Sequence, residues 1–213
     1  MRCLAALSFL AIATVARAAD ADAGTRVYAF KAFLDDKPIG EHRFTVVTEG
    51  ATRHVTSDAD FVVKFLGFSA YRYRHHAQEQ WSGDCLSSLA SSTGDDGKAA
   101  TVKLVRSGDT DEITTGAGKT SESGCLMTYA YWNPAMRTQR RLLNPQTGKV
   151  DDVRIERVAD GDVDASGKRV HATDWRITGG ESPVEVWISD QGEWVGLDSM
   201  VSKGKHKLRY RLP

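Results

Sequence analysis

The stretch YRYRHHAQEQW, from Tyr71 to Trp81, holds the residues of this chain that are best suited to bind or transform another molecule. Imidazole and carboxyl groups can exchange protons, and aromatic rings pack against apolar ligands. Alternate side chains of a β-strand point to opposite faces. One face of a strand here would carry Tyr71, Tyr73, His75, Ala77, Glu79 and Trp81, and the other, facing water, would carry Arg72, Arg74, His76, Gln78 and Gln80.

His75 and Glu79 lie four residues apart, roughly 13 Å on an extended strand, so they cannot pair with each other. If their face points inward, an unpaired Glu79 would be costly to bury or would stay protonated. One interpretation makes both residues satisfied members of a core, with His75 bonded to a backbone carbonyl and Glu79 to an arginine or tyrosine. A second interpretation is a ligand cavity lined by rings with a few polar groups. Acid/base catalysis by this pair is the third.

Further rings come from TYAYWNP, in which Tyr129 and Trp132 are candidate ligand contacts alongside the strand residues. The candidate ligand-binding residues are therefore Tyr71, Tyr73, His75, Glu79, Trp81, Tyr129 and Trp132. We assign no catalytic residue. The segment GAGKT, residues 116–120, has Ile113 where a phosphate-binding loop needs its first glycine, so it indicates a turn. No pair of histidines or cysteines has metal-ligand spacing, and we expect neither a metal nor a cofactor.

The N-terminus predicts export. Arg2, an apolar run from Leu4 to Val15 and the small-x-small sequence Ala16-Arg17-Ala18 are typical of a signal peptide over residues 1–18, cleaved before Ala19. Cys3 precedes the apolar run, which disfavours a lipid anchor at that residue. No later stretch is apolar enough for a membrane helix, so we expect no transmembrane segment. The mature protein would be periplasmic or secreted.

The mature chain, residues 19–213, is expected to form a single β-rich domain. Without Arg2 and Arg17 it has 26 basic and 28 acidic residues, a balance that gives no reason to expect nucleic acid as a partner. Cys85 and Cys125 are the two cysteines that remain after cleavage. In an oxidising compartment this pair predicts a disulfide, and two separate thiols are the alternative.

Apolar and polar residues alternate with a period of two, and Gly-rich turn segments interrupt this pattern, which predicts an all-β fold. A hairpin is expected over residues 26–48 and a strand on either side of Leu66-Gly67-Phe68. Later strands are expected near 84–92, 99–106, 110–115, 125–131, 150–158, 169–178, 183–189, 193–202 and 205–212. TGAGKTSESG and ADGDVDASGK are among the segments interpreted as turns between strands. Such spacing predicts an antiparallel meander that forms a curved sheet, a half-barrel or a closed barrel.

At most one short helix is expected after the signal peptide. Asn133 would cap it, with Pro134 at its first position and Ala135 to Arg141 as its body. The final segment puts Lys203, Lys205, Lys207, Arg209 and Arg211 on one strand face, which indicates a solvated surface. A surface for lipid headgroups would need these charges to cluster with Arg72 and Arg74. An outer-membrane barrel would show the same alternation, but many of these strands are too polar for its apolar outer band.

On KPIGEHRF, YRYRHHAQEQW, TYAYWNP, LLNPQTGKV and GKHKLRYRL, the chain resembles a family of exported bacterial proteins known as domain of unknown function 6134, over about residues 26 to 212. The resemblance implies export and a β-rich fold, and no activity. The expected meander also looks like the half-barrels of periplasmic lipoprotein and lipid carriers, although fold alone does not settle function.

Three functions remain open. The leading hypothesis is a non-catalytic binding module for a lipid or other apolar small molecule. The first alternative is an envelope structural or interaction module with a protein partner, which an unprotected edge strand would favour. The second alternative is an enzyme of unknown reaction that uses His75 or Glu79, so enzymatic activity stays open at this point. Ligand identity, oligomeric state and closure of the sheet do not follow from the sequence.

Overall fold

The computed structural model describes residues 24–65 and 68–213, and the expected signal peptide and Cys3 lie outside them. In the first part of the chain the strands are β1 (Gly24–Leu34), β2 (Lys37–Glu49), β3 (Thr52–Phe65), β4 (Phe68–Ser82), β5 (Cys85–Asp95), β6 (Lys98–Ser107), β7 (Thr110–Thr115) and β8 (Gly118–Ser123). Then come β9 (Met127–Thr128), the 3₁₀ helix η1 (Pro134–Thr138), β10 (Arg141–Leu143) and β11 (Val150–Asp152). The last strands are β12 (Arg154–Ala165), β13 (Lys168–Thr178), β14 (Val184–Ser189), β15 (Trp194–Val201) and β16 (His206–Arg211).

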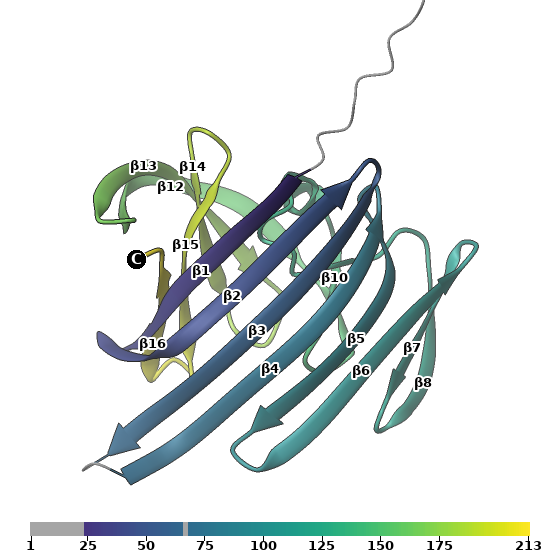
Figure 1. Cartoon of the computed structure of the whole chain (residues 1–213), viewed down its shortest axis with the longest axis horizontal. Coiled ribbons are helices and arrows are strands. Elements are labelled where there is room, and N and C mark those ends of the chain that lie inside the picture. Colours follow the sequence, from purple (N-terminus) through teal and green to yellow (C-terminus); the bar gives the residue numbers. More distant parts are fainter. Residues whose placement is uncertain (1–23, 66–67) are drawn as a thin grey trace, which may run out of the picture.

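Thirteen strands form one sheet in the order β12-β13-β14-β15-β16-β1-β2-β3-β4-β5-β6-β7-β8. The first strand lies inside the sheet, with β2 on one side and β16 on the other, and neighbouring strands run antiparallel. From β1 the chain meanders to the edge strand β8, leaves the sheet, and re-enters at the opposite edge with β12. The predicted all-β antiparallel meander is confirmed. Figure 1 shows β1 to β6 crossing the front of the view.

Several hairpins turn where the residue types favour it. Asp35 and Asp36 both have positive φ, as do Asp96 and Gly97, and Ser166 and Gly167. Each pair is the two-residue connection of a hairpin, between Leu34 and Lys37, Asp95 and Lys98, and Ala165 and Lys168 respectively. Positive φ at both central positions is typical of the type I′ turn, whose twist matches that of the strands it joins.

The core lies on one face of the sheet, and residues 124–153, here called the inner segment, pack against that face. This core face carries Phe30, Val55, Ala77 and Leu104 among others. The inner segment contributes Leu126, Met127, Ala130, Met136, Leu142 and Leu143 to the same cluster of buried residues. In Figure 1, β10 lies behind β3 and β4. The inner segment, which connects the edge strands β8 and β12, therefore covers the core face of the sheet.

The structure differs from four of the predicted segments. TGAGKTSESG contains strand β8, and the segment 159–165, expected to be a turn, continues β12 to Ala165. The strand expected over 125–131 is reduced to Met127–Thr128, which pairs in parallel with β10 in a separate three-stranded sheet. The helix is a 3₁₀ helix that ends at Thr138. Its predicted cap is present, since the Asn133 side chain accepts a hydrogen bond from the backbone N–H of Ala135.

Candidate functional site

Strand β4 orients its side chains as the alternation predicts. Ala77 and Trp81 are buried in the core, and His75 is 5% exposed on the same face. Arg72, Arg74, His76, Gln78 and Gln80 are all exposed on the other face. The core face of β4 thus holds all five of the strand residues proposed as ligand contacts: Tyr71, Tyr73, His75, Glu79 and Trp81.

Glu79 is partly buried and is held by side chains of the protein itself. Its Oε2 accepts a hydrogen bond from the Trp81 indole N–H at 2.9 Å. Burial raises the pKa of Glu79 to about 7, while hydrogen bonds from Trp81 and Thr128 act in the opposite direction. The expected arginine or tyrosine partner is therefore wrong. Because Thr128 belongs to β9, Glu79 links the sheet to the inner segment.

His75 is also satisfied internally. Its Nδ1 lies 2.9 Å from the hydroxyl of Thr93 on β5, rather than near a backbone carbonyl as expected. Burial lowers the pKa of His75 to about 4, with a smaller contribution from the neighbouring His76. The imidazole is consequently neutral at physiological pH. The hydrogen-bond partners of His75 and Glu79 are hydroxyl and indole groups rather than a second imidazole or carboxylate.

The aromatic side chains of the predicted set also have partners. Trp81 and Trp132 meet edge to face at 5.4 Å between ring centroids, and Tyr73 stacks on Phe61 at 5.4 Å. The Tyr129 hydroxyl donates to Asp151 at 2.9 Å, and Tyr71 interacts with Asp95. The space next to Trp132 measures about 10 Å³. That volume is close to the room for one water molecule and far below that of a ligand site.

A second polar group on the core face, centred on His42, was not predicted from the sequence. His42 Nε2 lies 2.8 Å from the Ser57 hydroxyl, and its Nδ1 lies 3.2 Å from the Tyr210 hydroxyl. Burial lowers the pKa of His42 to about 3, so this imidazole is a weak base. The arrangement satisfies three polar groups inside an aromatic core. Alternation along KPIGEHRF, which places His42 on the same face as Phe44, was the signal that could have identified it.

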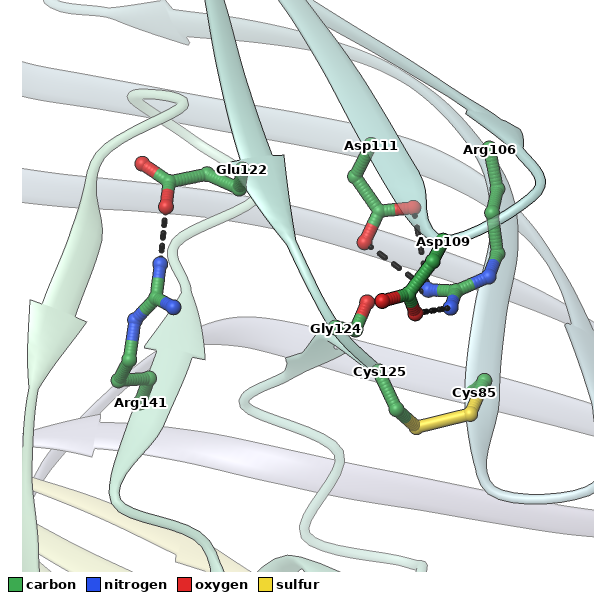
Figure 2. A network of polar contacts seen from close by, with 8 residues as sticks. All are labelled: Cys85, Arg106, Asp109, Asp111, Glu122, Gly124, Cys125 and Arg141. Atoms are coloured by element: carbon green, nitrogen blue, oxygen red, sulfur yellow. Dashed lines mark hydrogen bonds and ion pairs between the residues drawn. A yellow bond between two sulfur atoms is a disulfide. The ribbon is translucent and has the colours of Figure 1, made fainter.

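The start of the inner segment is fastened to strands β5 to β8, as Figure 2 shows. Cys85 and Cys125 form the predicted disulfide, with Cα atoms 5.0 Å apart. Arg106 donates to Asp111, whose side chain is fully buried, at 3.1 Å and to the carbonyl of Gly124 at 2.6 Å. Arg141 of β10 pairs with Glu122 of β8. Covalent and ionic contacts thus hold the chain where it leaves the sheet.

The basic residues near the C-terminus do not gather with those of β4. Three strands, β1 to β3, separate β16 from β4, which corresponds to roughly 19 Å at the usual strand spacing. Arg209 pairs with Asp36, and Arg211 pairs with Asp198 at 2.7 Å. Arg74 pairs with Asp60. A single basic surface made from both groups is therefore not formed.

An open groove of about 330 Å³ lies between the start of β1, the β12–β13 hairpin and the β14–β15 turn. Its apolar lining is Val27, Tyr28, Ala165, Val170, Trp194, Val195 and Leu212, and its polar lining is Arg26, Ser166, Lys168, Ser189, Gln191 and Glu193. Val163, Ala165, Ala172 and Val195 form a small second core at this place. Arg26 pairs with Glu193 at 2.9 Å. The groove could not be predicted from local sequence patterns, because its walls come from segments far apart in the chain.

Within residues 24–65 and 68–213, no three His, Cys, Asp or Glu side chains are grouped so that they could hold a metal ion. No helix of the described part of the chain is long and apolar enough to cross a membrane.

Comparison with known proteins gives a fold and a family. The crystal structure of a Brucella abortus protein, described as a beta-barrel-like protein of domain of unknown function DUF1849, superposes with a TM-score of 0.60. It covers 90% of this chain and 96% of its own, at 9% sequence identity, so the likeness is one of fold. No curated protein matches the chain. The family model described as domain of unknown function DUF6134 matches residues 30–212, and the chain belongs to that family.

Proposed function

We propose that this protein is a non-catalytic binding module that holds a lipid or another apolar small molecule in the groove beside β1. The observation that carries the proposal is the groove itself, about 330 Å³ in volume with seven apolar or aromatic residues in its lining. Small-molecule sites usually measure roughly 300–1,000 Å³ and combine an apolar lining with a few polar groups. Val27, at 47% exposure, is among the most exposed large apolar side chains of the described residues, and it lines this groove.

The binding module is proposed to act outside the cytoplasm, in the periplasm or after secretion. The signal-like sequence of residues 1–18 supports this proposal. The Cys85–Cys125 disulfide also fits an oxidising compartment. Fractionation of cells that express the full chain tests it: the protein recovered outside the cytoplasm should begin at Ala19, whereas full-length protein in the cytoplasmic fraction would contradict export.

The experiment that tests binding is native mass spectrometry of mature protein purified without detergent, followed by solvent extraction. An additional mass that extracts as a lipid is the expected result. Val27→Asp should abolish it, because a carboxylate in the groove would have to be desolvated by an apolar ligand. Val105→Asp is the matched control, since Val105 is 45% exposed and lies on β6, outside the groove lining. Equal ligand content in both variants would exclude the groove.

Ligand contact at the seven residues named from the sequence stays a separate prediction. A ligand there would have to lie among side chains that already contact one another, such as Trp81 and Trp132. The same extraction on Trp132→Ala separates the two places, because loss of ligand from that variant and its retention in Val27→Asp would favour the aromatic face.

A second candidate function is an envelope interaction module. The edge strands β8 and β12 each have a sheet partner on one side, and such edges can pair with another chain. Both carry features that discourage pairing: β8 has only six residues, and β12 has a register shift between Arg157 and Ala159. Cross-linking in intact cells, followed by identification of the adduct, tests this candidate. An adduct through β8 or β12 would support it, and a monomer without adducts would count against it.

A further inference from the structure

We infer that the groove prefers a single-chain amphiphile with a carboxylate head, such as a fatty acid, and that Lys168 selects this head group. This inference rests on the proposed function, because it requires the groove to bind an apolar ligand. It adds the class of ligand and the residue that distinguishes that class from neutral lipids.

The volume limits the ligand to one chain. About 330 Å³ is near the lower end of the range for small-molecule sites. The lining includes the apolar side chains of Val170, Val195 and Leu212, which belong to the small second core or pack against it. A linear hydrocarbon can lie along such a surface, whereas a lipid with two acyl chains would leave much of its apolar surface in water.

The charges at the rim determine the head group. Of the three charged residues in the lining, Arg26 and Glu193 pair with each other, and Arg26 also lies 3.5 Å from the Tyr28 hydroxyl. Lys168 is exposed and forms no ion pair with any residue that the structure describes. Its ammonium group is therefore the rim charge still available to a ligand. An anionic head complements it, and a cationic head would be repelled by it.

The type of side chain favours a compact monoanion. Lysine presents a flexible point charge, whereas arginine presents the planar fork that suits phosphate and other bidentate ligands. The one arginine in the lining is already engaged by Glu193. Polar groups that can donate further hydrogen bonds to a carboxylate stand in the same lining, among them the hydroxyl of Ser166 in the turn just before Lys168.

The test compares three probes with the same chain length, namely laurate, dodecanol and dodecylammonium, by isothermal titration calorimetry on mature protein freed of bound lipid. Laurate should bind about fivefold more tightly than dodecanol, which corresponds to a favourable ion pair at an exposed site. Dodecylammonium should bind most weakly. The preference for laurate should shrink as the salt concentration rises, because salt screens exposed charges.

Lys168→Glu should remove the preference for laurate and make dodecylammonium the better ligand of the two charged probes. Lys98→Glu is the matched control. Lys98 also follows a two-residue type I′ turn, is exposed, and is the first residue of its strand, but it lies outside the groove lining. Its substitution should leave all three affinities unchanged.

The outcomes separate this inference from the proposed function. Equal affinities for laurate and dodecanol, both lost in Val27→Asp, would overturn the carboxylate preference and leave the groove as the binding site. A laurate preference that survives Lys168→Glu would overturn the role of Lys168. If none of the probes binds, or if binding is indifferent to Val27→Asp, the proposed function fails and this inference fails with it.

Discussion

The core face beneath the inner segment and the groove beside β1 are both lined by apolar and aromatic side chains, but only the groove is left open. On the core face, Trp81 packs against Trp132 and donates to Glu79, so ring and carboxylate satisfy each other. In the groove, Val27 remains about half exposed. Aromatic richness with a few buried polar groups therefore marks a well-packed core as readily as a ligand site, and accessible apolar surface is the better indicator of binding.

The two regions should differ most in how far a substitution lowers the free energy of unfolding. Trp81 is fully buried, so Trp81→Ala should lower the free energy of unfolding by about 3–5 kcal/mol. The substitution also removes the indole that donates to Glu79. Val27→Ala in the groove should cost less than about 1 kcal/mol, because an exposed side chain gains little from folding. Urea denaturation of both variants measures this, and similar losses would mean that the two regions are not distinct.

Removal of the disulfide should produce the next largest effect, again at the core face. The bridge joins residues separated by 40 positions, and closing such a loop stabilises a fold by at most about 4 kcal/mol in the chain-entropy model. The double variant Cys85→Ser and Cys125→Ser should therefore unfold at a lower urea concentration. At temperatures where the double variant remains folded, it should still bind ligands in the groove. A variant that keeps its stability but loses ligand would contradict the separation of the two regions.

Glu79 makes the core face sensitive to pH. Burial raises the pKa of its carboxyl from 4.5 to about 7 in the folded protein, so the folded state binds the proton more tightly than the unfolded state. The resulting stabilisation is present below about pH 4.5 and is lost as the pH rises through 7, by at most about 3 kcal/mol. Glu79→Gln keeps an acceptor for the Trp81 indole. Relative to the unsubstituted protein, this variant should gain stability between pH 4.5 and 8, and a constant difference over that range would contradict the raised pKa.

The smallest difference in stability is expected between Val27→Asp and Val105→Asp. Both valines are about half exposed on a strand, so each substitution should lower the free energy of unfolding by a similar amount, about 1 kcal/mol. Ligand content, in contrast, should differ between the two variants. Thermal unfolding without lipid should give nearly equal midpoints. A large loss of stability in Val27→Asp alone would mean that the groove wall is part of the packed core.

The strand pattern was predictable where alternation and turn residues agree. The hairpin turns at Asp35-Asp36 and Asp96-Gly97 carry residue types that tolerate positive φ, and the strands that flank them lie close to the predicted ranges. Strand β8 was missed because its sequence GKTSES is polar and faces water along most of its length. Its strand conformation comes from pairing with β7, which local composition does not reveal.

The candidate sites were predictable only in part, because their partners are distant in sequence. Alternation correctly placed Glu79 and His75 on the inward face, but Thr128 and Thr93 could not be paired with them before the register was known. The inner segment crosses the core face instead of continuing the meander. Its path depends on long-range contacts, which local sequence patterns do not reveal. The groove depends on the β12–β13 hairpin approaching β1, which no local pattern records.

The placement of β1 inside the sheet has a consequence for the order in which the protein folds. In the meanders β1 to β8 and β12 to β16, each strand pairs with its neighbour in sequence. The seam between β1 and β16 instead joins residues about as far apart as the chain allows, such as Asp35 and His206 with a separation of 171. Contacts of such long sequence separation form slowly, because the loop must close before they stabilise the fold. Two meanders should therefore form early and independently, and their joining along the β1–β16 seam should be the rate-limiting step of folding.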